Sequence, residues 1–289
     1  MKRTAVFVFV IVAAAGCRAK PTPPAKGGAA RFEALADTTW PAGPLGNAAR
    51  RGHALLAHTP DSLPQYAVSG LRCFNCHLDE GTRRNGLLLI GAFARYPQYR
   101  SRSAHMETIT DRVNDCFKRS LNGHPLPVDG PEMHDIVTYL AYISRGVALF
   151  DSTPGQGLPK LKSLPADTAR GATLFASTCA RCHGVDGAGI APVPPLWGAR
   201  SFNIGAGMAR LNTAAAFIRL NMPFDKPGSL TDQEAYDVAS FVVSHPRPDY
   251  PGKELDWPKG DPPPDVAYPT AAAAKKAAIV TRPTPTSAH

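Results

Sequence analysis

The pattern that most constrains the fold of this chain is a Cys-x-x-Cys-His motif that occurs twice. The two copies lie 106 residues apart and consist of Cys73, Cys76 and His77 and of Cys179, Cys182 and His183. In this motif the two thiols bind the vinyl groups of a haem as thioethers, and the histidine binds the haem iron. We therefore expect two covalently attached haem c groups, one for each copy.

Two other sites use closely spaced cysteines. A thioredoxin-like redox pair needs no histidine after its second cysteine, and a zinc site needs further Cys or His ligands at matching spacing. The six cysteines also do not form a disulfide framework, because four belong to the motifs and Cys17 belongs to the leader. Only Cys116 is left over, without a partner.

Both motifs lie within a repeated pattern of helices. A short apolar segment that starts at a glycine precedes each copy, at Gly52 and at Gly171. An amphipathic helix follows each copy, the first after Pro131 and the second after a capping box of Thr231 and Glu234. No strand pattern is comparably strong. The sequence predicts an all-α protein of two tandem cytochrome c domains, residues 32–150 and 166–259, joined by a linker at 151–165.

The two ends of the chain are expected to lie outside these domains. Residues 1–17 have the positive start and short apolar run of a signal peptide, and they end in a lipobox-like Ala-Gly-Cys17. We expect export to the periplasm or cell envelope with a lipid anchor on Cys17; ordinary signal-peptide cleavage is the alternative. Residues 18–31 read as a flexible tether, and the Pro/Ala-rich residues 260–289 as a largely disordered tail.

The formal net charge of +9 does not indicate nucleic-acid binding. Part of it lies in the leader and tail, and haem propionates offset more. The basic residues between Arg72 and Arg119 surround the first motif and are suited to attract a small anion. The alternative for most of them is an ordinary solvated surface.

A second axial ligand for each iron is expected at the same offset in both repeats. Met222 follows His183 by 39 residues and lies in a Met-Pro pair just before the terminal helix. His/Met ligation raises the potential of a haem, which suits an electron acceptor. Met208 is the rival ligand, because it lies closer to His183 in a glycine-rich stretch.

In the first repeat the same 39-residue offset from His77 falls on Cys116. A thiolate ligand lowers the potential of the iron, so electrons would flow from the first haem to the second. A sulfur nucleophile beside an oxidising haem also suits sulfur–sulfur chemistry. The alternatives are a buried free cysteine that acts as a small hydrophobe, or ligation by one of His105, Met106, His124, Met133 and His134.

Over about residues 47–268 the sequence resembles the thiosulfate dehydrogenase family of dihaem cytochromes c. The stretches that carry the resemblance are residues 63–66, 73–78, 112–123, 125–127, 221–223, 232–239 and 246–248. The segment around Cys116 is the most specific, since generic cytochromes lack it. The resemblance implies that two thiosulfate ions are joined to tetrathionate with loss of two electrons, or the reverse.

The resemblance also implies roles for individual residues. His77 and Cys116 would bind the catalytic haem iron, and His183 and Met222 the electron-transfer haem iron. Arg102 and Arg112 would hold the dianionic substrate, for which a guanidinium is well shaped. Some relatives carry Lys immediately before the distal Met, where this chain has an asparagine, so the preferred direction stays open. The electron partner would be a small cytochrome or a similar carrier.

Two other functions are weighed against this one. A pure electron shuttle explains both haems but gives Cys116 and the arginines no role, and His/Met ligation of the first haem would favour it. A haem subunit of a multi-protein sulfur-oxidising complex would need a tightly bound partner. A dihaem peroxidase is disfavoured, because nothing in the sequence marks an open distal site.

Overall fold

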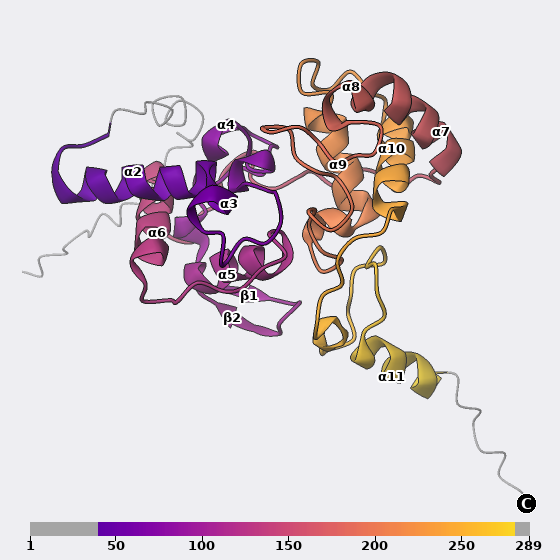
Figure 1. The fold of residues 1–289 in the computed structure, drawn as a ribbon. Coiled ribbons are helices and arrows are strands. Elements are labelled where there is room, and N and C mark those ends of the chain that lie inside the picture. Colours follow the sequence, from indigo (N-terminus) through magenta and orange to yellow (C-terminus); the bar gives the residue numbers. More distant parts are fainter. Residues whose placement is uncertain (1–39, 281–289) are drawn as a thin grey trace, which may run out of the picture.

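A computed structural model of the chain describes residues 40–280 and is mainly helical (Figure 1). The first half contains α2 (Gly43–Ala57), α3 (Thr59–Ser62), η2 (Cys73–Asn75), α4 (Leu78–Gly81), η3 (Phe93–Arg95), β1 (Gln98–Arg100), β2 (His105–Glu107), α5 (Ile109–Arg119) and α6 (Pro131–Ile143). The second contains α7 (Thr168–Leu174), η4 (Phe175–Cys179), α8 (Ala180–His183), η5 (Gly207–Ala209), α9 (Leu211–Asn221), α10 (Asp232–Ser244), η6 (Lys253–Leu255) and α11 (Ala271–Val280). The predicted signal peptide with Cys17, the predicted tether and residues 281–289 lie outside the described residues.

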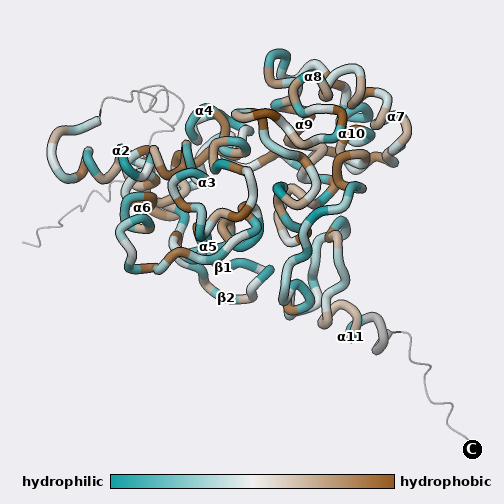
Figure 2. Tube along the Cα trace, viewed as in Figure 1, coloured by the Kyte–Doolittle hydropathy of each residue, from teal (hydrophilic) through white to brown (hydrophobic). Residues whose placement is uncertain are grey.

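The helices form two lobes, one for each Cys-x-x-Cys-His motif (Figure 1). Hydrophobic residues are spread through both lobes rather than gathered in one (Figure 2). Within residues 40–280 the strands form a single antiparallel pair, β1 and β2, in which Gln98 faces Glu107 and Arg100 faces His105. Strands of three residues are too short to give the alternating pattern that predicts a strand.

The predicted repeat is visible in how the first and last helices of each lobe cross. In the first lobe α2 packs on α6, and in the second α7 packs on α10. At both crossings a glycine lies against the backbone carbonyl of an aspartate, Gly52 on Asp135 and Gly171 on Asp237. The residue before each glycine is an arginine whose guanidinium binds that aspartate, at 2.7 Å in the first lobe and 2.8 Å in the second. The two crossings therefore use the same close helix contact.

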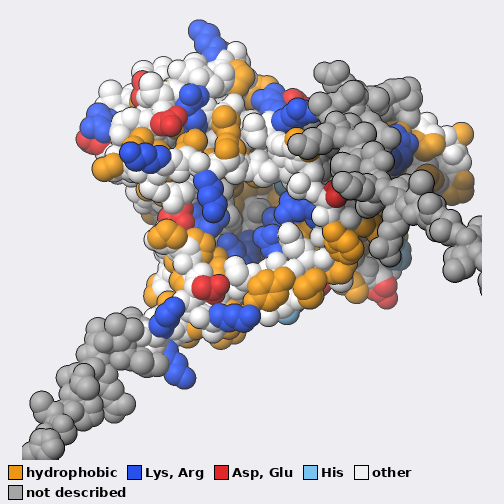
Figure 3. Space-filling model, turned by 180° about the vertical axis from the view of Figure 1, so that it is seen from behind, with side chains coloured by type: hydrophobic (Ala, Val, Ile, Leu, Met, Phe, Trp, Pro, Cys, Tyr) orange, Lys and Arg blue, Asp and Glu red, His pale blue; other side chains and the backbone are white. Residues whose placement is uncertain are grey.

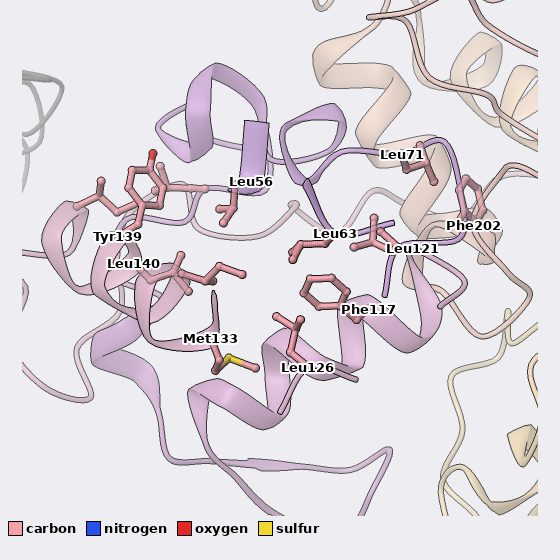
Figure 4. Close-up of a cluster of buried hydrophobic side chains, with 14 of the residues drawn as sticks. Leu56, Leu63, Leu71, Phe117, Leu121, Leu126, Met133, Tyr139, Leu140 and Phe202 are labelled. Carbon is pink, nitrogen blue, oxygen red and sulfur yellow. The ribbon is translucent and has the colours of Figure 1, made fainter. Parts of the chain in front are cut away.

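The larger hydrophobic core lies in the first lobe and includes side chains from the second. Figure 4 shows Phe117 of α5 beside Leu63, and Phe202 of the second lobe close to Leu71. Ala206 and Ala209 belong to the same buried cluster. The loop before α9 thus packs into the first lobe and fixes the two lobes against each other.

The predicted linker also packs against the folded parts. Thr153 is buried against Gly91 in the first lobe. Leu161 and Leu164 lie against the core between α9 and α10. No helix within residues 40–280 has both the length and the hydrophobicity needed to cross a bilayer.

The expectation of a largely disordered tail from residue 260 was wrong for residues 260–280. Tyr268 and Thr270 are buried, and the Tyr268 hydroxyl donates a hydrogen bond to Asp256 at 2.5 Å. Helix α11 follows and lies at the lower end of the second lobe in Figure 1. The proline-rich composition does not predict these contacts, because composition is an average over the segment and the contacts depend on single side chains.

Candidate haem and anion-binding sites

The histidine of each motif is oriented by a backbone carbonyl. His77 Nδ1 bonds the carbonyl of Leu87, and His183 Nδ1 bonds that of Pro194 at 3.1 Å. This arrangement leaves the Nε2 atom of each ring as the free ligand, which is how metal-binding histidines are commonly held. Burial lowers the pKa of His77 to about 4 and also lowers that of His183. Both rings are therefore neutral, the form that binds a metal.

The motif cysteines have the properties required for thioether attachment. All four are unpaired. Burial raises the pKa of Cys73 and Cys76 to about 12, and that of Cys179 to about 11. Cys73, Cys76 and Cys179 are therefore neutral thiols rather than the low-pKa thiolates of a redox pair. The sulfurs and the oriented imidazoles together fit a haem in each lobe.

Helix α5 brings Cys116 to the first motif. The helix starts at a capping box in which the Thr108 side chain accepts a hydrogen bond from the backbone N–H of Asp111, and the Asp111 carboxylate accepts one from Thr108. Cys116 is half-buried and lies close enough to Cys73 and Cys76 to add, after burial, to the rise in pKa of both thiols. The sequence predicted Cys116 as the distal ligand of this haem, and its position near the motif is compatible with that role.

One turn earlier on α5, Arg112 faces the same site. Its guanidinium makes no hydrogen bond or ion pair to any side chain described in residues 40–280. The charge of Cys116 raises the pKa of Arg112, with smaller contributions from Tyr96, Asp115 and Glu107. A guanidinium that stays charged and keeps its donors unpaired beside the first motif is suited to bind an oxyanion.

Two more arginines lie before and within β1. Arg95 and Arg100 both donate to the Gln98 side-chain oxygen, at 3.4 and 3.3 Å. Tyr96 lies between them in the chain; burial raises its pKa, and Arg112 and Arg100 oppose that rise. Seen from behind, the molecule has a hollow with Lys and Arg side chains around it (Figure 3). Sequence analysis did not single out Tyr96 or Gln98, because neither belongs to a motif.

Glu107 is a second residue that the sequence did not reveal. It is buried at the end of β2, where Oε1 accepts a hydrogen bond from the Ser103 hydroxyl at 2.6 Å. Its Oε2 has no hydrogen-bond partner in the described part of the chain. Glu107 also contributes to the raised pKa of Arg112. Its carboxylate therefore belongs to the wall of the same site.

The structure gives Arg102 different neighbours from Arg112. The Arg102 guanidinium donates to the carbonyl of Gly205 at 2.6 Å and lies 4.7 Å from the centre of the Trp257 ring. Burial lowers the pKa of Arg102 to about 10. These contacts place Arg102 at the boundary between the lobes. Its predicted role in holding substrate stays a prediction.

The two methionines proposed for the second iron occupy different surroundings. Met222 directly follows Asn221, the last residue of α9, and the Asn221 side chain donates to the carbonyl of Asn85 at 2.9 Å. Met208 packs against the core of the first lobe. A methionine already used in that core is the weaker ligand for the second haem, so Met222 stays the predicted one.

The first and second motifs are joined by a short connection. Asn75, inside the first motif, donates a hydrogen bond to the carbonyl of Pro192 at 3.1 Å. Pro192 is two residues from Pro194, whose carbonyl orients His183. A side chain of the first motif therefore contacts the loop whose backbone orients the second haem-binding histidine.

Comparison with known proteins gives the family of each lobe. Residues 66–149 match the SoxA/TsdA cytochrome c domain, and residues 168–246 match the cytochrome c family. The chain is 42% identical to a thiosulfate dehydrogenase of Allochromatium vinosum over 72% of its own length and 81% of that protein's. It is 40% identical to one from Psychrobacter arcticus, over 80% of this chain and 72% of the relative. The chain belongs to the thiosulfate dehydrogenase family.

A solved structure agrees with this membership. The thiosulfate dehydrogenase (TsdBA) from Marichromatium purpuratum, in its as-isolated form, superposes with a TM-score of 0.72 at 35% identity. The match covers 77% of this chain and 52% of that one, so this chain spans about half the length of the solved protein. As a thiosulfate dehydrogenase family member with two cytochrome c domains, the protein carries two covalently bound haem c groups, which confirms the prediction from the motifs.

Proposed function

We propose that this protein joins two thiosulfate ions to tetrathionate with release of two electrons, and that it can also run the reverse reaction. The observation that carries the proposal is the pairing on one helix of a half-buried sulfur, Cys116, with the guanidinium of Arg112, which has no side-chain partner within residues 40–280, beside the first haem-binding motif. The names of the relatives give the same substrate.

Electrostatics explains why cations must line the site. Two unit charges about 4 Å apart interact by about 4 kcal/mol at an effective dielectric of about 20, so two dianions repel by about 16 kcal/mol. Arg112 alone offsets only part of this repulsion. Arg95 and Arg100, held together by Gln98, are the next guanidiniums available on the wall that carries Tyr96. These groups would hold both anions with their outer sulfurs facing each other.

The remaining roles follow from the chemistry of the side chains. Each haem c, when bound, takes up one electron at a time. Cys116 would supply a soft sulfur for the reacting sulfurs, and the neutral His77 ring would hold the first haem. His183 and Met222 would hold the second haem, from which the two electrons leave to an external carrier such as a small cytochrome.

The direct test is turnover by purified holoprotein. We expect thiosulfate to reduce an artificial electron acceptor with one tetrathionate formed per two electrons. Arg112→Gln should raise the KM for thiosulfate about tenfold or more, because a hydrogen bond to a charged group is lost. The matched control is Arg50→Gln, an exposed arginine on α2. Fully reducible haems without any thiosulfate turnover would instead indicate an electron shuttle.

We also propose that the protein works in the periplasm or cell envelope and is anchored by a lipid on Cys17. The basic start, the short apolar run and the Ala-Gly-Cys17 sequence support this. Cys17→Ala should release the holoprotein from the membrane fraction into the soluble fraction. A mature N-terminus that begins beyond Cys17 would show ordinary signal-peptide cleavage instead.

A further inference from the structure

The helix that carries Cys116 is capped by the other lobe. The last four carbonyls of a helix have no partner within it. In α5, the carbonyl of Lys118 accepts a hydrogen bond from the Asn203 side chain at 2.8 Å, and that of Arg119 accepts one from the Asn203 backbone N–H at 3.1 Å. Asn203 is 2% exposed. A single buried residue of the second lobe therefore caps the last two carbonyls of α5. The two carbonyls before them are bonded within the first lobe, where the Leu121 N–H donates to Cys116 and the Gly123 N–H donates to Phe117, both at 2.9 Å.

The same end of α5 is held by a buried ion pair. The two terminal nitrogens of Arg119 each donate to one oxygen of Asp256 at 2.8 Å, and both side chains are at most 10% exposed. The Tyr250 ring lies 4.1 Å from the guanidinium carbon of Arg119. Tyr268 donates to Asp256 from the other side. This bidentate, desolvated ion pair joins the end of α5 to residues that follow α10.

Both contacts act close to the predicted iron ligand. Cys116 is three residues before Arg119, which is about 4.5 Å along a helix axis. A helix is stiff over one turn, so a displacement of its capped end also moves Cys116. The first lobe itself fixes the start of α5 through Thr108 and bonds the carbonyl of Cys116 through Leu121, while the final residues of the helix are held from the second lobe.

We propose that Asn203 and Asp256 are positioning residues that fix Cys116 against the first haem-binding motif. The second domain then does more than receive electrons, because it sets the ligand geometry of the first. This proposal rests on Cys116 being the distal ligand and does not depend on which anion is the substrate.

The test uses holoprotein with Asn203→Ala and, separately, Asp256→Asn. Asn203→Ala is the milder change, since it removes hydrogen bonds without leaving a charge unpaired. The matched control is Asp249→Asn, which removes an exposed ion pair to Lys253 seven residues before Asp256. The readouts are the electron paramagnetic resonance spectrum of the ferric protein, the reduction potential of each haem and the kinetics with thiosulfate.

We expect both variants to split or shift the thiolate signal of the first haem and to move its potential, while the second haem is unchanged. The kcat should fall about fivefold with little change in KM, because the loss of a typical hydrogen bond is of that size. The control should match wild type. Variants with an unaltered first-haem signal would overturn the positioning role, and a wild-type protein without a thiolate signal would overturn it together with the ligation. An intact second-haem spectrum shows that each variant is folded.

Discussion

Replacing Gly52 or Gly171 by alanine should destabilise one lobe at a time. A Cβ on Gly52 would lie 2.0 Å from the carbonyl oxygen of Asp135, and a Cβ on Gly171 would lie 2.0 Å from that of Asp237. Ordinary contact begins near 3.4 Å. The obstacle is backbone rather than a flexible side chain, so the two helices themselves must separate.

The size of the effect follows from two opposing terms. Overpacking a tight contact costs about 3 kcal/mol at the upper end of its usual range. The higher helix propensity of alanine offsets about 1 kcal/mol of that cost. The net loss is about 2 kcal/mol, which for a single lobe of about 100 residues lowers the Tm by about 12 °C.

The assay is thermal unfolding of the holoprotein, followed by far-ultraviolet circular dichroism and by the Soret bands of the two haems. Gly207→Ala is the matched control, since a Cβ there meets nothing within 4 Å. We expect Gly52→Ala to disturb the first haem earlier and Gly171→Ala the second. If both variants melted within about 1 °C of the control, the close helix crossings described above would be refuted.

Three further predictions concern single side chains. Tyr96→Phe should raise the KM for thiosulfate about tenfold with kcat nearly unchanged, because the Tyr96 hydroxyl has no hydrogen-bond partner within residues 40–280; an unchanged KM would remove Tyr96 from the anion site. Thr231→Ala should cost about 1 kcal/mol in urea unfolding at pH 7. The hydrogen bonds from Thr231 lower the pKa of Glu234, so the capping box stabilises the fold fully at pH values above the ordinary glutamate pKa. The difference in unfolding free energy between Thr231→Ala and wild type should therefore shrink as the pH falls through the lowered pKa of Glu234. A pH-independent difference in unfolding free energy would contradict the capping box. Met222→Leu should lower the potential of the second haem and Met208→Leu should not; the opposite result would exchange their roles.

The haem chemistry was predictable because it is local in sequence. Each attachment site lies within five residues, and the distal candidates Cys116 and Met222 follow from one shared offset of 39 residues. The terminal helix of the second lobe also has a local signal, the capping box that starts at Thr231. Local patterns of this kind can be recognised from the sequence without any knowledge of tertiary contacts.

The wall of the anion site was harder to predict because its residues meet only through the fold. Tyr96, Gln98 and Glu107 come from two very short strands and their flanking turns, which have no periodic pattern. The contacts between lobes were equally hidden. Asn203 reaches α5 across more than 80 residues of chain, and Asp256 reaches Arg119 from 137 residues away.

The measurement that tests the central claim most directly is electron paramagnetic resonance of the oxidised holoprotein and of its Cys116→Gly variant. The account predicts two distinct low-spin ferric haems in the wild type, one with the signature of His/thiolate ligation and one of His/Met ligation. The thiolate signal should vanish in Cys116→Gly, together with tetrathionate formation, while the His/Met signal stays. Two His/Met signals in the wild type, or a first-haem signal unaffected by loss of Cys116, would contradict the account.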